Sequence, residues 1–151
     1  MKRLWLLLLL TSCASGPAYS ELPEGTQIVV YRPSDFINFS SRFWIEDNGT
    51  EFCRLHNAAF VVHQVEPGKH TLSSSNWGSV GTSRISFDVK LGETVYVKMD
   101  MNGERALTGA IGGMIANAGD EAISSNGPVY LGNVTREKAL HELQGLSRDC
   151  Q

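Results

Sequence analysis

The chain has 151 residues, and its 13 lysine and arginine residues against 16 aspartate and glutamate residues give a net charge of −3. This acidic balance, without a basic cluster in the body of the chain, argues against nucleic acid as a partner. Charged residues make up only 19% of the chain while it holds 15 glycines, which favours a loop-rich β-protein over a helical one.

The N-terminus carries the pattern of a secretory signal. Lys2 and Arg3 precede an apolar run over residues 4–10, as in the charged and apolar regions of such a signal. A helix of that length rises only about 10 Å, whereas the hydrocarbon core of a bilayer is about 30 Å thick. The run is therefore too short for a permanent transmembrane helix.

Residues 10–12, Leu-Thr-Ser, stand directly before Cys13. This order resembles the lipobox of bacterial lipoproteins. The resemblance implies that residues 1–12 are removed as a signal peptide, that Cys13 receives diacylglycerol, and that its new amino group is acylated. Several acyl chains anchor a protein stably, because each buried methylene contributes about 0.8 kcal/mol and one chain alone binds only marginally.

The residues after Cys13 bear on where the protein sits. In Gram-negative lipoproteins an aspartate at the next position tends to retain the protein in the inner membrane, so Ala14 favours the outer membrane, facing the periplasm. Cleavage before Cys13 leaves 11 basic against 16 acidic residues, a net charge of about −5. Residues 13–25 predict a short tether that keeps a domain over residues 26–147 near the bilayer. The alternative is an ordinary signal, cleaved near residues 18–20, that releases a soluble protein.

From Thr26 onward, short β-rich runs follow one another, separated by turn signals. Asn48-Gly49 predicts a hairpin with a type I′ turn, since both residues tolerate positive φ angles. Pro67-Gly68 predicts a second tight turn. We expect an antiparallel, immunoglobulin-like β-sandwich of about seven strands; the runs are 27–31, 42–46, 51–55, 60–65, 70–73, 84–89 and 94–101.

A glycine-rich insert over residues 106–118 interrupts this alternation. Gly109 and Gly113 are spaced so that helices can approach closely in a membrane. Gly112 and Gly113 each destabilise a helix in water by about 1 kcal/mol. The segment is open to three interpretations: a small-residue helix packed on the sandwich, a loop, or a membrane-contacting or self-associating segment.

A C-terminal helix follows a further short strand at Val129–Leu131. Thr135 is expected to cap the helix, with Glu137 in its first turn. An apolar stripe should face the sandwich, and the helix should end at Gly145 or Ser147. The stripe consists of Ala139, Leu140, Leu143 and Leu146.

Four segments in a fixed order make the middle of the chain recognisable. They are Tyr-Arg-Pro-Ser at 31–34, Val-Glu-Pro-Gly-Lys-His-Thr at 65–71, the glycine-rich insert, and Lys-Ala-Leu-His-Glu-Leu at 138–143. From about residue 28 to 146 the chain resembles a domain-of-unknown-function family of small bacterial envelope lipoproteins. That family has no established activity, so the resemblance assigns no catalytic residue and no cofactor.

With Cys13 lipidated, Cys53 and Cys150 remain. An oxidising envelope would allow them to pair; the alternative is two independent thiols. The family does not share Cys53, so such a bond would belong to this protein and its near relatives.

The histidines do not predict a metal site. His56, His63 and His70 recur every seven residues, an odd spacing that gives opposite faces of a strand, with turns between them. We expect His70 to be a surface or turn-packing residue. The chain has no Gly-x-Ser-x-Gly elbow, so nothing in it predicts an enzyme.

Five aromatic residues give the remaining hint of a ligand surface. Phe43 and Trp44 are expected in the core, whereas Trp77, in a polar stretch, is expected to be exposed and is the candidate ligand contact; Phe36 and Phe39 complete the set. We expect a non-catalytic, membrane-anchored envelope protein with a structural or protein-interaction role. The alternative is a module that binds cell-wall glycan or a small ligand.

Overall fold

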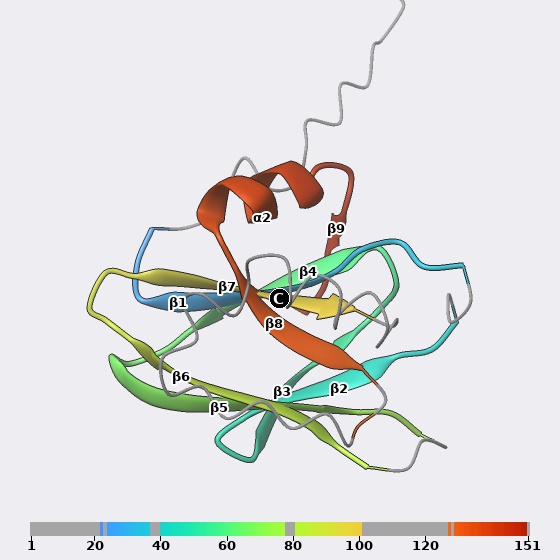
Figure 1. Cartoon of the computed structure of the whole chain (residues 1–151), viewed down its shortest axis with the longest axis horizontal. Helices are drawn as coiled ribbons and strands as arrows, with labels where there is room; N and C mark the ends of the chain where they lie inside the picture. Colours follow the sequence, from blue (N-terminus) through green and yellow to red (C-terminus); the bar gives the residue numbers. More distant parts are fainter. Residues whose placement is uncertain are drawn as a thin grey trace, which may run out of the picture.

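The computed structural model describes residues 22, 24–36, 40–77, 81–100, 127 and 129–150. These residues form two β-sheets packed face to face and one helix on the outer face of one sheet (Figure 1). The fold is therefore mainly β and sandwich-like, as the alternating runs predict.

The first sheet, here called sheet A, has the strand order β8-β7-β1-β4-β9. Its strands are β1 (Gln27–Arg32), β4 (Ala59–Gln64), β7 (Thr94–Asp100), β8 (Tyr130–Val134) and β9 (Ser147–Arg148). Sheet B has the order β3-β2-β5-β6. Its strands are β2 (Phe43–Asp47), β3 (Thr50–Leu55), β5 (Gly68–Ser75) and β6 (Ser83–Val89).

The prediction of purely antiparallel sheets is wrong for sheet A. β1 runs parallel to β7, and β4 runs parallel to β9. Tight turns fix the direction only of strands that follow one another in sequence, whereas these pairs form after long excursions through the other sheet or the helix. Sequence alternation assigns a residue to a face but says nothing about the direction of a distant neighbour.

Two hydrophobic clusters explain the three layers. The inner cluster lies between the sheets and includes Ile28 and Val30 of β1. The outer cluster lies between sheet A and helix α2 (Arg136–Glu142), and it includes Val29 and Tyr31 of the same strand. All six residues of β1 are buried, because this strand has a layer on each face.

The hairpin turn and the helix cap predicted from the sequence are both present in the structure. Asn48 and Gly49 have φ angles of 48° and 82°, as a type I′ turn requires. The Thr135 side chain accepts a hydrogen bond from the Lys138 amide and caps α2. The helix ends at Glu142, earlier than predicted, and a turn over 143–145 leads to β9, which is too short to be read from the sequence.

Candidate functional site

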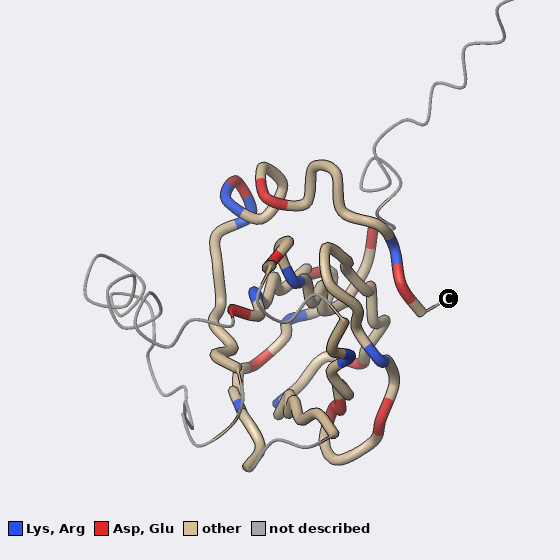
Figure 2. The backbone as a smooth tube through the Cα atoms, turned by 90° about the vertical axis from the view of Figure 1, so that its right-hand side faces the viewer, with Lys and Arg blue, Asp and Glu red and all other residues tan. Residues whose placement is uncertain are grey.

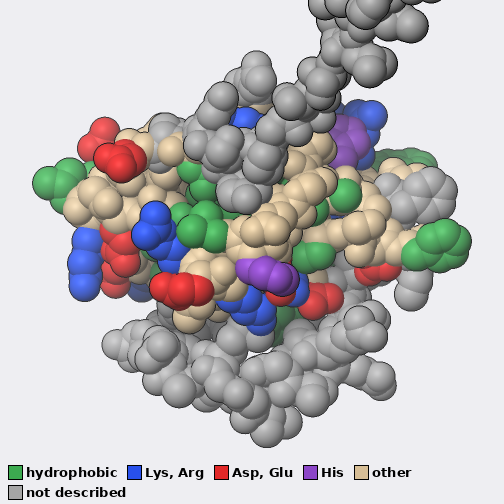
Figure 3. Space-filling view, turned by 90° about the horizontal axis from the view of Figure 1, so that it is seen from above, with side chains coloured by type: hydrophobic (Ala, Val, Ile, Leu, Met, Phe, Trp, Pro, Cys, Tyr) green, Lys and Arg blue, Asp and Glu red, His purple; other side chains and the backbone are tan. Residues whose placement is uncertain are grey.

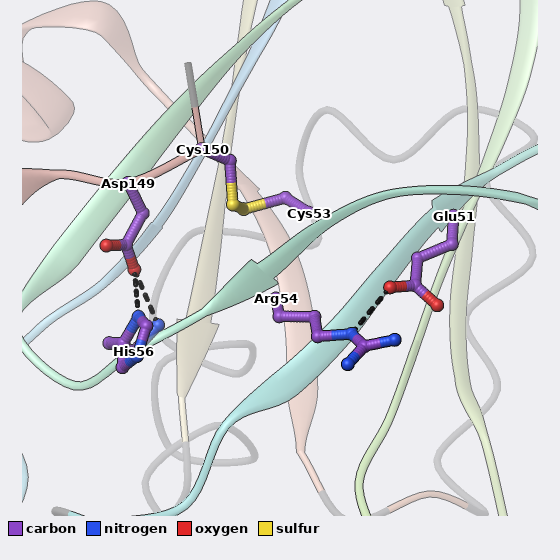
Figure 4. The surroundings of a disulfide bond; sticks show 6 residues. All are labelled: Glu51, Cys53, Arg54, His56, Asp149 and Cys150. Atoms are coloured by element: carbon purple, nitrogen blue, oxygen red, sulfur yellow. Dashed lines mark hydrogen bonds and ion pairs between the residues drawn. A yellow bond between two sulfur atoms is a disulfide. The ribbon is translucent and has the colours of Figure 1, made fainter.

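The chain's C-terminal segment is fastened to the edge strand of sheet B. Cys53 of β3 and Cys150, two residues beyond β9, form a disulfide with Cα atoms 5.6 Å apart (Figure 4). Because β9 pairs with β4 in sheet A, this bond joins the two sheets covalently along one side of the sandwich.

Polar contacts support the same junction. The Asp149 carboxylate accepts a hydrogen bond from the His56 amide at 2.8 Å and contacts His56 Nδ1 at 2.8 Å (Figure 4). The Ser147 and Asp149 amides donate to the carbonyls of Ala58 and Phe60. The ring of His56 is 46% exposed, so the ion pair itself adds little and the backbone pairing positions the segment.

Two exposed aromatic residues lie at one end of the sandwich. Trp77 is 90% exposed and Phe36 is 91% exposed. Phe36 follows β1, and Trp77 follows β5, whose last residue pairs with Trp44 near the start of β2. Both aromatic side chains therefore project from loops at the end where β1 and β5 finish, which we call the loop end.

Hydrogen bonds position the loop beside Phe36. Asp35 and Asn57 exchange two bonds, since the Asp35 amide donates to Asn57 Oδ1 at 2.9 Å and Asn57 Nδ2 donates to the Asp35 carbonyl at 3.0 Å. Buried Arg32 donates from Nη1 to the Ser41 carbonyl at 2.7 Å, and its guanidinium lies 4.9 Å from the centre of the Phe43 ring. Burial lowers the pKa of Arg32, and Asp35 opposes that shift.

The prediction that Phe43 and Trp44 lie in the core is right for Phe43 and wrong for Trp44, because neighbouring residues of β2 point to opposite faces of sheet B. Phe43 is fully buried in the inner cluster and Trp44 is half-buried, with the Arg54 guanidinium 5.9 Å from its ring centre. Phe39 lies outside the described residues. The loop end thus presents two exposed aromatic side chains, and the loop of Phe36 is held by hydrogen bonds. Each ring could stack against a sugar ring or an apolar side chain.

A polar cluster lies at the opposite end of the sandwich. The Asp47 carboxylate contacts His70 Nδ1 at 2.8 Å and His63 Nε2 at 3.4 Å. His70 Nε2 lies 2.9 Å from the Glu66 carbonyl, and the His63 ring stacks on Phe52 with centroids 3.9 Å apart. Burial lowers the pKa of His63, although Asp47 acts in the opposite direction.

This cluster ties the sheets together where the chain crosses from β4 to β5. Both ring nitrogens of His70 face acceptor oxygens, one on Asp47 and the other on the Glu66 carbonyl, so the buried ring bridges the turn and the end of β2. His70 is therefore a buried turn-packing residue. Sequence reasoning missed the pairing with His63, because the two histidines belong to different sheets and meet only through Asp47.

A second polar group fastens α2 to sheet A. Tyr31 Oη donates to Glu142 Oε2 at 2.6 Å, and Lys98 Nζ contacts Glu142 Oε1 at 3.1 Å. Burial and the nearby carboxylate raise the pKa of Tyr31. Burial acts to raise the pKa of Glu142, but the hydrogen bonds from Tyr31 and Lys98 outweigh it and the net shift is downward.

Three predicted site residues lie outside the described part of the chain: Cys13, Gly109 and Gly113. Within the described residues, no group of three or more metal-binding side chains could hold a metal ion. No helix among those residues is long and apolar enough to cross a bilayer.

The described histidine contacts are of a structural kind. The polar contacts of His56, His63 and His70 within the described residues go to carboxylates and to one carbonyl.

The chain matches no protein-family model, and comparisons with curated proteins and with solved structures give no match either.

Proposed function

We propose that this chain is a bacterial envelope lipoprotein, anchored through Cys13, whose domain has a non-catalytic structural or protein-interaction role. The sequence Leu-Thr-Ser-Cys at 10–13, placed behind a short apolar run, carries this proposal. The acyl chains hold the domain at the outer membrane, facing the periplasm, where it binds a partner protein. We also propose that the sandwich is immunoglobulin-like, since the chain changes sheet repeatedly between its strands.

The disulfide supports an envelope location. Disulfides persist in oxidising compartments such as the bacterial periplasm and are rare in the cytosol. The bond between Cys53 and Cys150 joins β3 to the segment after β9, and such a bond persists where thiols are oxidised. A periplasmic lipoprotein meets that condition.

Replacement of the lipidated cysteine tests the anchor. The Cys13→Ser variant of the full chain should leave the membrane fraction of fractionated cells, because no thiol remains to accept diacylglycerol. Ala14→Asp is the matched control, which should stay membrane-bound and shift toward the inner membrane. Sedimentation of Cys13→Ser with membranes, or a native intact mass without acyl groups, would refute the proposal.

A second candidate function rests on the loop end. The exposure of Trp77 and Phe36 on two loops at the same end of the sandwich favours a surface that stacks on cell-wall glycan, because sugars bind to exposed aromatic faces. In this alternative the anchored domain binds a glycan or a small ligand instead of a protein.

Two binding experiments separate these candidates. Titration with soluble cell-wall fragments should change tryptophan fluorescence, and Trp77→Ala should abolish the change, if glycan is the ligand. Leu91→Ala is the control, since Leu91 is 85% exposed at the other end of the sandwich. A stoichiometric partner recovered from envelope membranes, together with no response to the fragments, supports the protein-interaction role.

A further inference from the structure

Strand β6 lies at an edge of sheet B, the lower layer in Figure 1, and its register with β5 is unbroken over all seven residues. The other edge strands have features that discourage a further strand. The register of β3 with β2 is irregular and β3 is tied down by the disulfide, β9 has only two residues, and β8 contains Gly132 and leads directly into the cap of α2. The most regular edge of the sandwich is therefore β6.

Hydrogen bonds of the neighbouring strand show which backbone groups of β6 face outward. The Asn48 amide donates to the Thr71 carbonyl, so the backbone of Thr71 faces β2 and not β6. Thr71 lies opposite Ser86, and opposite residues of an antiparallel pair either both face each other or both face away. The amides and carbonyls of Ser86, and by alternation those of Arg84 and Asp88, therefore point to the free side of β6. Within the described part of the chain, they make no backbone hydrogen bond across this edge.

The side chains of the same three residues form a self-complementary pattern. Arg84 and Asp88 are exposed on the outer face of sheet B, and the half-buried Ser86 hydroxyl between them lies 2.9 Å from that of Thr71. When the β6 strands of two copies run antiparallel with Ser86 opposite Ser86, each Arg84 lies opposite the Asp88 of the other copy. Opposite residues have Cβ atoms about 4.5–5.5 Å apart, within reach of an ion pair.

The backbone groups fit this register as well. The three residues with outward amides and carbonyls are then opposite one another, and each opposite pair exchanges two hydrogen bonds, about six in all. A pair centred on Arg84 or on Asp88 would instead place like charges opposite each other, which destabilises paired strands. Charges on an edge strand ordinarily discourage pairing, but the two charges of β6 favour one register.

Charge alone does not single out this edge. Basic and acidic positions are interspersed along the described backbone (Figure 2), and basic, acidic and apolar side chains are mixed on the side of α2 (Figure 3). The distinguishing feature of β6 is the spacing of its charges, since Arg84 and Asp88 flank Ser86 symmetrically on one face of a regular edge strand.

We propose that two copies of this chain associate through their β6 edges, antiparallel and centred on Ser86, so that the two B sheets form one continuous sheet. The partner is a second copy because the edge complements itself, as a two-fold interface requires. An interface of one strand from each copy is small, so the dimer dissociates on dilution. This inference goes beyond the proposed function and does not depend on the lipid anchor.

A cysteine at the centre of the interface tests the register. Opposite residues of a hydrogen-bonded pair have Cα atoms about 5.5 Å apart, a separation that a disulfide bridges. The purified full chain with Ser86→Cys, treated with a mild oxidant, should give a covalent dimer on non-reducing electrophoresis. Ser75→Cys is the matched control, because Ser75 is also half-buried but lies on β5, inside the sheet. The control should give roughly fivefold less dimer.

Equal yields from the two variants would indicate random collisions and overturn the pairing, as would the absence of a dimer from Ser86→Cys. A higher yield from Arg84→Cys than from Ser86→Cys would place the centre of the pair elsewhere and overturn the proposed register.

Exchange of the charges tests the ion pairs. Arg84→Asp and Asp88→Arg, each alone, place like charges opposite each other and should raise the dissociation constant of the dimer roughly tenfold. Sedimentation equilibrium of the full chain in a density-matched detergent measures this constant. A mixture of the two variants should restore association, since each acidic residue then faces an arginine of the other chain.

The mixture separates pairing between copies from effects within one chain. Lys69 lies opposite Asp88 in the register of β5 and β6, so Asp88→Arg also changes a contact inside sheet B. Mixing cannot repair that contact, and restored association would therefore come from the interface. A mixture that associates no better than either variant alone overturns the proposed dimer.

Discussion

The two long sides of the sandwich are closed by different means. On one side, which we call the disulfide edge, β3 lies against β4, and the bond between Cys53 and Cys150 joins sheet B to the segment after β9. On the other side, the serine edge, β6 lies against β8. There Ser83 Oγ donates to the Val129 carbonyl and accepts from the Val129 amide at 3.2 Å.

Gly127 shows how closely the serine edge is packed. A Cβ atom at this position would overlap the backbone of Thr82 and Ser83, so the segment before β8 fits against β6 only without a side chain. The disulfide edge depends on a covalent bond and on titratable groups, whereas the serine edge depends on shape and neutral hydrogen bonds. A change in redox conditions or pH should therefore lower the stability of the disulfide edge and leave that of the serine edge unchanged.

Loss of the disulfide should have the largest effect. The bond closes a loop with a sequence separation of 97, and removing a native disulfide from a small domain costs about 2–5 kcal/mol of folding free energy. Urea unfolding with and without reductant measures the difference. In the double variant Cys53→Ala/Cys150→Ala the reductant should change nothing, and equal stability of the native chain in both conditions would contradict the importance of this edge.

A side chain at position 127 should have the next largest effect. Gly127→Ala forces the segment before β8 away from Ser83, and overpacking of this kind costs about 1–3 kcal/mol. Gly92→Ala is the control, because Gly92 has a φ of 75° but open space around it, so it isolates backbone strain from overlap. Reductant should not alter the loss of unfolding free energy caused by Gly127→Ala. A loss no larger than that of Gly92→Ala would mean that the serine edge shifts to accommodate the added methyl group.

The sequence predicts the strands at both edges of the sandwich, but not the contacts that hold the two sheets together there. Alternation places Ile85, Phe87 and Val89 on the inner face of β6, where the structure has them buried, because a period of two assigns faces directly. The sheet to which a strand belongs, and its direction, depend on contacts between distant segments.

Contacts between single residues at the two edges are equally hard to predict from the sequence. The contact of Ser83 with Val129 spans 46 residues, and a lone serine at the first position of a strand gives no signal of it. The exposure of Trp77 could be predicted because its neighbours are small and polar, whereas Cys53 and Cys150 could be predicted as a pair only because they were the cysteines left after Cys13.

Acid should weaken the disulfide edge slightly, through His63. Burial lowers the pKa of this histidine in the folded state below its ordinary value near 6.5, so the unfolded chain binds more protons as the pH falls. The contribution of neutral His63 to the folding free energy is fully present above the pKa that this histidine has in the unfolded chain, and it is lost as the pH falls below that value.

His63→Phe keeps a ring against Phe52 and should flatten the pH dependence of the unfolding midpoint between about pH 7 and 5. His56→Phe, at an exposed ion pair of the same edge, serves as the comparison and should leave most of the slope in place; if it removes as much of the slope as His63→Phe, the burial of His63 is not the source of the acid sensitivity.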